Sequence, residues 1–161
     1  MAGKMLKGRT ALVTGATQGI GEAIAQALAA AGADVVVHGI EPLAGGEAAA
    51  SALAEAHGVR AAYVRADLAD PAQAAALVSR AAQALAAPDI LVNNAGIQHT
   101  CPIESFPPER WDAIIAINLS AAFHTMRAAV PAMRERGWGR IVNIASVHGL
   151  VASVNKTAYL A

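Results

Sequence analysis

A glycine-rich turn near the start of the chain has the composition needed to bind the phosphates of a nucleotide. Gly15, Gly19 and Gly21 are spaced G-x3-G-x-G, between an apolar stretch that begins at Thr10 and a helical pattern. Glycine permits positive φ and lets the backbone approach a pyrophosphate, whose charge a helix N-terminus attracts. The spacing differs from the G-x-G-x-x-G of the common dinucleotide fingerprint. Because the turn lies between a buried strand and an amphipathic helix, it predicts nucleotide binding.

The residues after the second apolar run bear on which nucleotide this would be. An acidic residue there would bind the adenosine ribose and favour NAD, whereas a basic residue would favour NADP. Neither Gln18 nor Gly39 nor Ile40 offers a cation to a 2′-phosphate, and Glu41 follows just beyond, so the sequence favours NAD. Asp67 is placed either to accept a hydrogen bond from the adenine amino group or to cap the next turn.

Short β-branched runs alternate with long alanine-rich stretches, and this alternation predicts strands joined by helices. Each run is apolar on both faces, as expected of strands that helices cover on both sides. Such an order is typical of an α/β fold with a doubly wound parallel sheet, which is Rossmann-like. The predicted strands are Thr10–Thr14, Asp34–His38, Ala61–Arg65, Ile90–Asn93 and Arg140–Ala145.

Four helices are predicted between these five strands. They run from Gly19 to Ala31, from Pro42, from Pro71 behind the N-cap candidate Asp70, and from Pro108 to Arg136. In the first helix, Ile20, Ile24 and Leu28 recur at the spacing of one buried face. A similar stripe in the fourth helix consists of Trp111, Ile115, Asn118, Ala122, Met126, Ala129 and Met133.

Composition and charge exclude several classes of function. The 161 residues, enough for one domain, carry 12 basic and 12 acidic side chains, which gives no electrostatic case for nucleic acid or a membrane surface. No uncharged apolar run reaches about 18 residues, the length of a membrane helix. One cysteine, Cys101, fits a reducing compartment, so we expect a cytoplasmic protein. No metal site is expected, because four of the histidines are not spaced as metal ligands, and we assign them no chemistry. They are His38, His57, His99 and His124.

The motifs together resemble those of the classical short-chain dehydrogenases, in order and in separation, over essentially the whole chain. They comprise the glycine turn, Asp67-Leu68, Asn93-Asn94-Ala95-Gly96, Asn118, Ser146 and Tyr159. Carried over by this resemblance, Tyr159 is the catalytic acid/base, Ser146 positions the substrate oxygen and Asn118 anchors a proton-relay water. The resemblance implies cofactor contacts from Gly15, Thr17, Gln18, Gly19, Ile20, Gly21, Ile40, Asp67, Leu68, Asn94, Ala95, Gly96, Ile117 and Tyr159.

Within that family the chain is similar to bacterial NAD-dependent 3-hydroxybutyrate dehydrogenases. The similarity lies in the segments 94–99 and 145–153, in Trp138-Gly139-Arg140 and in Lys156. It implies that Gln98, His148 and Lys156, together with Ser146 and Tyr159, bind a small 3-hydroxy acid. A cation, an imidazole and an amide that converge on the carboxylate would neutralise it and orient the reacting alcohol. The implied reaction is oxidation of (R)-3-hydroxybutyrate to acetoacetate and its reverse.

The family places a lysine four residues after the catalytic tyrosine, to lower a phenol pKa that is ordinarily about 10. Here that position would be 163, beyond Ala161, so we expect residues 1–161 to be one dinucleotide-binding domain, incomplete at its C-terminus and inactive alone. Two alternatives remain: another short-chain dehydrogenase, such as a 3-oxoacyl reductase or a sugar dehydrogenase, and a non-catalytic nucleotide-binding module. The family's assembly mode predicts a homotetramer.

Overall fold

The computed structural model describes residues 4–161, and its core is one sheet of five parallel strands in the order β3-β2-β1-β4-β5. The sheet confirms the predicted doubly wound α/β class, and each strand lies within about two residues of its predicted bounds. The first three residues of the predicted domain lie outside the described part. The strands are β1 Thr10–Val13, β2 Asp34–Gly39, β3 Ala61–Arg65, β4 Ile90–Asn93 and β5 Arg140–Asn143.

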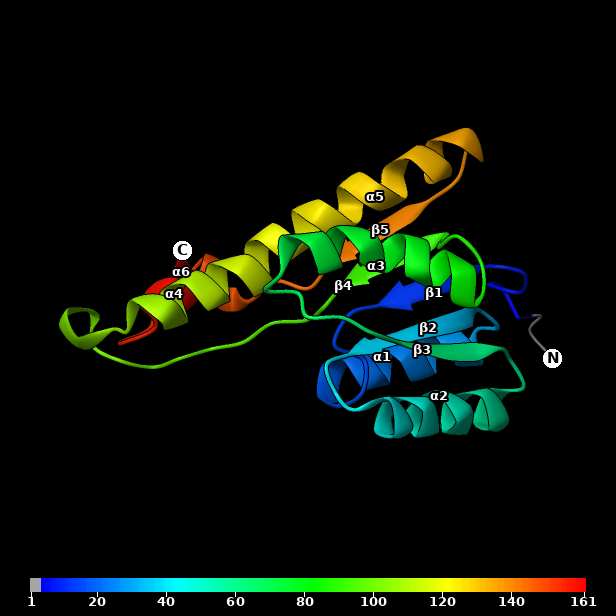
Figure 1. The fold of residues 1–161 in the computed structure, drawn as a ribbon, viewed down its shortest axis with the longest axis horizontal. Helices are drawn as coiled ribbons and strands as arrows, with labels where there is room; N and C mark the ends of the chain where they lie inside the picture. The colour runs from blue at the N-terminus through cyan, green and yellow to red at the C-terminus, as the bar shows by residue number, and fades with distance from the viewer. Residues whose placement is uncertain (1–3) are drawn as a thin grey trace.

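Helices cover the sheet in two layers. α1 (Gly19–Ala30) and α2 (Leu43–His57) lie on one face, and α3 (Pro71–Ala84) and α5 (Ala121–Glu135) lie on the other (Figure 1). Successive strand residues point to opposite faces, so neighbouring residues of β1 and β2 enter two separate cores. Asp70 caps α3 as predicted, with its carboxylate accepting from the backbone N–H groups of Ala72 and Gln73.

The buried face of α1 differs from the predicted one. Its buried residues are Gly21, Ala25 and Ala29, one position beyond the predicted stripe, because these small residues let the helix pack closely on the sheet. Ile24 and Leu28 are half-buried at the margin of that core. Ile20 is 66% exposed.

The predicted helix Pro108–Arg136 is not uniform. It consists of α4 (Pro108–Ile115), a π-helical turn η2 (Ala116–Ser120) and α5, which contains Pro131. The extra residue in a π turn rotates the residues before it relative to those after it. The predicted stripe is therefore wrong at its start, where Trp111 is exposed. The buried side chains are Ile114, Ala121, Thr125, Ala129 and Met133.

This long helical segment also meets the length and composition test for a membrane span. Over Pro108–Glu135, 28 residues, its most apolar 18-residue window has a mean hydropathy of 1.4 and is 22% buried. Covering helices of water-soluble domains pass the same test. Here α5 packs against α3 and β4, and Thr125 donates a 2.8 Å hydrogen bond to Asn93 at the end of β4, so the segment belongs to the layer that covers the sheet.

β5 is less covered than the sequence suggests. It lies at the edge of the described sheet, and three of its four residues are exposed, so coverage on both faces is not seen for β5 within residues 4–161. Three short elements were not predicted: η1 Ile103–Ser105, η3 Val147–Gly149 and α6 Thr157–Leu160.

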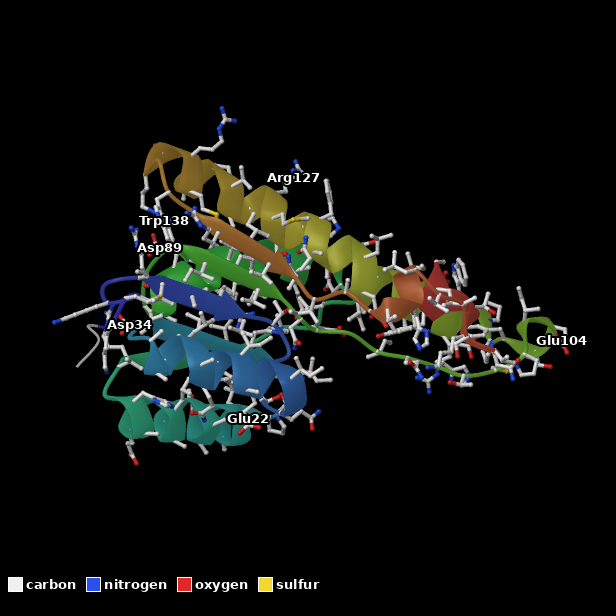
Figure 2. The ribbon with its side chains drawn as sticks, turned by 180° about the vertical axis from the view of Figure 1, so that it is seen from behind. Glu22, Asp34, Asp89, Glu104, Arg127 and Trp138 are labelled. Atoms are coloured by element: carbon white, nitrogen blue, oxygen red, sulfur yellow. The ribbon has the colours of Figure 1, made fainter. Side chains whose placement is uncertain are left out.

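A buried carboxylate joins the amino-terminal ends of β1 and β4 to the end of α5. Asp89, which directly precedes β4, is 8% exposed; one of its oxygens lies 3.3 Å from Arg9 Nη1 and 3.4 Å from Arg136 Nε. The other oxygen accepts the N–H of Thr10 at 3.0 Å. Trp138, under the guanidinium of Arg9, lies at this same end of the sheet, far from the loop that carries Glu104 (Figure 2).

Replacing Asp89 with alanine is expected to lower the free energy of unfolding by about 3 kcal/mol, because two guanidinium groups and a backbone N–H lose their acceptor. Urea denaturation monitored by circular dichroism measures this loss. Asp112→Ala removes an exposed carboxylate from α4 and serves as the matched control. An equal effect of both substitutions would contradict the structural role of Asp89.

Candidate active site

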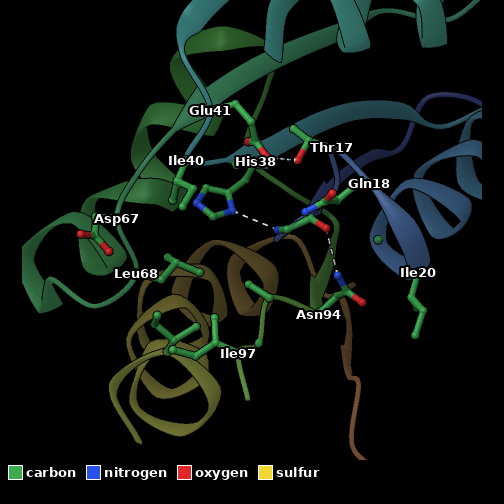
Figure 3. A pocket seen from close by; sticks show the side chains of 16 residues that line it. Thr17, Gln18, Ile20, His38, Ile40, Glu41, Asp67, Leu68, Asn94 and Ile97 are labelled. Carbon is green, nitrogen blue, oxygen red and sulfur yellow. Dashed lines mark hydrogen bonds between the residues drawn. The ribbon is translucent and has the colours of Figure 1, made fainter. Parts of the chain in front are cut away.

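Loops after the strands enclose a cleft of about 390 Å³ at the carboxyl edge of the sheet. It lies beside β1 and β4, where the strand order reverses, which is the position that ligands favour in doubly wound sheets. We call it the glycine-turn cleft (Figure 3). Its lining is Gly15, Thr17, Gln18, Ile20, Gly21, His38, Gly39, Ile40, Glu41, Asp67, Leu68, Asn94, Ala95, Gly96, Ile97 and Ile117.

The glycine turn is tightly packed. Gly15 has φ 61°, and a Cβ there would lie 3.0 Å from the Cα of Ala95. A Cβ at Gly21 would overlap the carbonyl oxygen of Gly15. Gln18, the N-cap of α1, makes no side-chain capping hydrogen bond, which leaves the first-turn N–H groups of α1 for an anion. The local geometry therefore fits a pyrophosphate.

Thr14 and Asn94 fix the turn to the loop after β4. The hydroxyl of Thr14 accepts the N–H groups of Asn94 and Ala95 at 2.9 and 3.0 Å. In return, the amide of Asn94 donates to the carbonyls of Thr14 and Gly15 at 2.9 and 3.1 Å. Thr14 was not among the predicted site residues, although it directly precedes the glycine turn.

Asp67 performs the capping role that the sequence left open. Its carboxylate accepts the N–H of Ala69 at 2.9 Å, and its side chain also lines the cleft. Contact with adenine stays a prediction.

His38, at the end of β2, is buried beneath the cleft and was assigned no chemistry from the sequence. Its Nδ1 accepts the N–H of Gly15 at 3.1 Å, while Nε2–H donates to the carbonyl of Ala66 at 3.1 Å. Burial lowers the pKa of His38 from 6.5 to about 4, although the hydrogen bond to Ala66 and the nearby charge of Glu41 act in the opposite direction. His38 is therefore neutral at pH 7, and it joins the glycine turn to the end of β3.

The depressed pKa of His38 makes stability dependent on pH. Below pH 6.5 the unfolded chain binds a proton on this histidine and the folded chain does not, so folding weakens as pH falls from 6.5 to about 4. The expected loss over this window is about 3 kcal/mol. The loss is measured by urea denaturation across that pH range, as the difference in the free energy of unfolding between the native protein and His38→Asn. His124→Asn is the control, and parallel profiles for the native protein and His38→Asn would refute the assignment.

A second cleft of about 650 Å³ adjoins the first and shares Ile20, Asn94, Ala95, Gly96 and Ile97 with it. We call it the tyrosine cleft. It brings together three of the predicted catalytic and substrate residues: Gln98 from the loop after β4, Ser146 from the loop after β5, and Tyr159 from α6. Asn118, on the π-helical turn, lines it as well.

Asn118 ties the helical layer to the loop after β4. Its side-chain oxygen accepts the N–H of Ile97 at 2.9 Å, and its amide donates to the carbonyl of Ile97 at 3.0 Å. A π turn often marks a functional position. The contacts show a positioning role for the side chain, and its part in a proton relay stays a prediction.

His148 and Lys156 form a pair beside the tyrosine. Lys156 Nζ lies 3.1 Å from His148 Nε2, and His148 Nδ1 lies 3.2 Å from the carbonyl of Val151. This arrangement fits an imidazole whose Nδ1–H donates a hydrogen bond to the carbonyl of Val151 and whose Nε2 accepts a hydrogen bond from the ammonium group of Lys156. The His148 ring meets the ring of Tyr159 edge-on, with 6.0 Å between centroids. Neither His148 nor Lys156 lines the tyrosine cleft in this structure.

The predicted residues thus gather at one edge of the sheet. Of the predicted cofactor contacts, Gly19 does not line the glycine-turn cleft and Tyr159 lines the tyrosine cleft. Four lining residues of the first cleft were not predicted: His38, Gly39, Glu41 and Ile97. Of these four, Glu41 had been noted in the sequence as an acidic residue just beyond the second strand, but not as a contact. Among residues 4–161, no group of His, Cys, Asp and Glu is arranged to hold a metal ion.

Comparison with known proteins agrees with this geometry. Residues 9–161 match the family described as short chain dehydrogenase. The chain is 54% identical over 158 residues to a D-beta-hydroxybutyrate dehydrogenase of Cupriavidus necator, covering 98% of the chain and 60% of that relative. A D-beta-hydroxybutyrate dehydrogenase of Rhizobium meliloti is 47% identical over 153 residues, which cover 95% of this chain and 59% of that relative. The chain therefore spans about 60% of the length of these curated relatives.

Solved structures of other specificities share the same fold. A 3-oxoacyl (acyl-carrier-protein) reductase from Agrobacterium tumefaciens with NADP bound superposes with a TM-score of 0.89 at 38% identity, covering 98% of this chain and 60% of that one. A gluconate 5-dehydrogenase from Burkholderia cenocepacia, in complex with NADP and tartrate, superposes with a TM-score of 0.90 at 35% identity. The match covers 98% of this chain and 61% of that one.

Proposed function

The chain belongs to the short-chain dehydrogenase family, and from that premise we propose that it is the cofactor- and substrate-binding part of an NAD-dependent (R)-3-hydroxybutyrate dehydrogenase. The observation that carries the substrate class is the Lys156–His148 pair beside the ring of Tyr159. The pair supports the proposal because a cation beside Tyr159 would bind the carboxylate of a small hydroxy acid, although neither residue lines the tyrosine cleft in this structure. The named relatives support the same assignment.

In the proposed reaction, the side chains of the tyrosine cleft accept the proton and orient the alcohol. Tyr159 in its ionised form would accept the hydroxyl proton on its phenolate oxygen, and the hydroxyl of Ser146 would donate a hydrogen bond to the substrate oxygen. The bound nicotinamide supplies the acceptor for the hydride. Lys156 binds the carboxylate, with His148 and Gln98 beside it, and this contact decides which face of the alcohol carbon is presented.

The glycine-turn cleft fits a dinucleotide, and the residues that would hold it are those of its lining. The backbone of the glycine turn and the start of α1 would carry the pyrophosphate. Ile40, Asp67 and Leu68 would bound the adenosine, and Ile117 would lie nearer the nicotinamide. NAD rather than NADP is our proposal, because none of the described lining residues is a lysine or an arginine.

A substrate panel tests the proposal against the other family activities. We expect the full-length protein that carries this sequence to prefer 3-hydroxybutyrate over 3-hydroxyacyl thioesters, which lack the carboxylate, by at least about 100-fold in kcat/KM, the effect of one charged contact. We also expect it to prefer 3-hydroxybutyrate over the larger gluconate, which shares the carboxylate. A thioester preference would support a 3-oxoacyl reductase, the activity printed for one neighbour. Cofactor binding without turnover of any of these substrates would support a non-catalytic module. That residues 1–161 alone are inactive stays a prediction.

An oligomer is part of the proposal. Leu119 and Phe123, on the outer side of η2 and α5, are 62% and 56% exposed, and such a patch fits a helix pair between subunits of a cytoplasmic homotetramer. Sedimentation velocity on the full-length protein tests it, and a monomer at micromolar concentration would refute it.

A further inference from the structure

His38 is a buried titratable side chain that the proposed reaction does not use. It lies near the end of β2, is 2% exposed and lines the inner side of the glycine-turn cleft. Burying a polar ring is costly unless its nitrogens are hydrogen-bonded, and here both are. Their partners are backbone groups of two distant segments: the N–H of Gly15 in the glycine turn, drawn in Figure 3, and the carbonyl of Ala66 just after β3.

These two partners fix the position of the proton on the ring. The N–H of Gly15 can only donate, so Nδ1 is an unprotonated acceptor, with 3.1 Å between the two nitrogens. The carbonyl of Ala66 can only accept, so Nε2 carries the proton, also at 3.1 Å. Burial lowers the pKa of His38 to about 4, and the ring therefore keeps this form at neutral pH.

The backbone of His38 holds the next residue of the turn. Its carbonyl oxygen accepts the N–H of Ala16 at 2.8 Å. The side chain and the backbone of His38 thus bind the N–H groups of two successive turn residues, Gly15 and Ala16. The first-turn N–H groups of α1 have no side-chain cap. The conformation of the segment that would carry the pyrophosphate therefore depends on one residue of the neighbouring strand.

We propose that His38 is a positioning residue that holds the glycine turn in the conformation that binds the dinucleotide, through the acceptor Nδ1. The ring also joins this turn to the segment after β3, where Asp67 and Leu68 would bound the adenosine. The inference rests on the proposed dinucleotide function and deepens it. A site that is already in its bound conformation loses less free energy on binding. Without an acceptor at Nδ1, the turn relaxes in the free protein until the N–H of Gly15 meets water, and the cofactor has to restore it.

Two substitutions separate the roles of the two ring nitrogens. His38→Asn puts its side-chain oxygen close to the position of Nδ1, where it accepts the N–H of Gly15 but does not reach Ala66. His38→Gln puts its amide close to the position of Nε2, where it donates to Ala66 and leaves the N–H of Gly15 without an acceptor. Isothermal titration of the full-length protein with NAD, in the absence of substrate, compares them. We expect His38→Asn to bind NAD within about threefold of the native affinity and His38→Gln about tenfold more weakly, the effect of one hydrogen bond.

The comparison separates positioning of the turn from general support of the fold. Each variant loses one hydrogen bond, so urea denaturation should show similar losses of stability in both. A merely structural role would change NAD affinity alike in both. His124→Gln, on α5 and outside the glycine-turn cleft, is the matched control and should bind NAD as the native protein does.

Equal NAD affinities of His38→Asn and His38→Gln, or weaker binding by His38→Asn, would overturn the assignment to Nδ1. If His38→Gln does not fold, His38→Asn decides. Affinity within about threefold of native, together with an amide of Gly15 that stays protected from hydrogen exchange, supports the assignment, and any larger loss overturns it. Failure of the native protein to bind NAD would instead overturn the proposed function, so the two failures are distinguishable.

Discussion

Replacing Tyr159 with phenylalanine is expected to lower kcat for 3-hydroxybutyrate oxidation by about 10³-fold, within the range of general acid–base catalysis. The substitution removes only the phenol oxygen from the tyrosine cleft. The ring that meets His148 edge-on is kept, so folding and the approach to the cleft should be preserved. Stopped-flow or steady-state measurement of reduced nicotinamide gives the rate on the full-length protein.

The control for Tyr159→Phe is cofactor affinity, since the glycine-turn cleft does not include Tyr159. NAD should bind to the variant within about tenfold of the native value, because one uncharged hydrogen bond at most is lost. Ser146→Ala should also reduce kcat, by about 10²-fold, through loss of a hydrogen bond to the substrate oxygen. Retention of native turnover by Tyr159→Phe would contradict the catalytic assignment.

The second large effect is expected at Lys156. Lys156→Ala should lower kcat/KM for 3-hydroxybutyrate by about 100-fold, because a charge-assisted contact to the carboxylate is worth about 2–3 kcal/mol. Most of this loss should appear in KM if the contact exists equally in the bound substrate and in the transition state. The pairing with His148 at 3.1 Å is also lost, so His148→Asn should show a smaller effect in the same direction.

An uncharged substrate separates recognition of the carboxylate from general damage. Butan-2-ol has the same reacting alcohol without the carboxylate, and its slow oxidation should change less than about threefold in Lys156→Ala. Lys7→Ala, an exposed lysine before β1, is the matched control and should affect neither substrate. Equal losses for the acid and for the alcohol would assign Lys156 a structural role.

The sequence predicted the features that depend on local residue types. Apolar runs located the strands, Asp70 before Pro71 located the start of α3, and Gly15 to Gly21 located the turn between β1 and α1, because capping, proline geometry and glycine conformation act within a few residues. The parallel direction of the strands followed from the alternation of strands and helices along the chain.

Features that depend on packing between distant segments were not predictable in the same way. The buried face of α1 is set by how closely Ala25 and Ala29 let it approach the sheet. The π turn carries Asn118, whose side chain makes two hydrogen bonds to Ile97 in the distant loop after β4. The pairing of Thr17 with Glu41 joins residues 24 apart in sequence. Such contacts require the folded sheet edge.

The most direct measurement is the initial rate of NAD reduction when the full-length protein is given (R)-3-hydroxybutyrate, with acetoacetate measured in the same samples. We expect one acetoacetate for each NAD reduced, and a rate that falls by about 10³-fold in Tyr159→Phe. A folded, NAD-binding protein that forms no acetoacetate, or that oxidises gluconate or a thioester substrate faster, would contradict the assignment to a 3-hydroxybutyrate dehydrogenase.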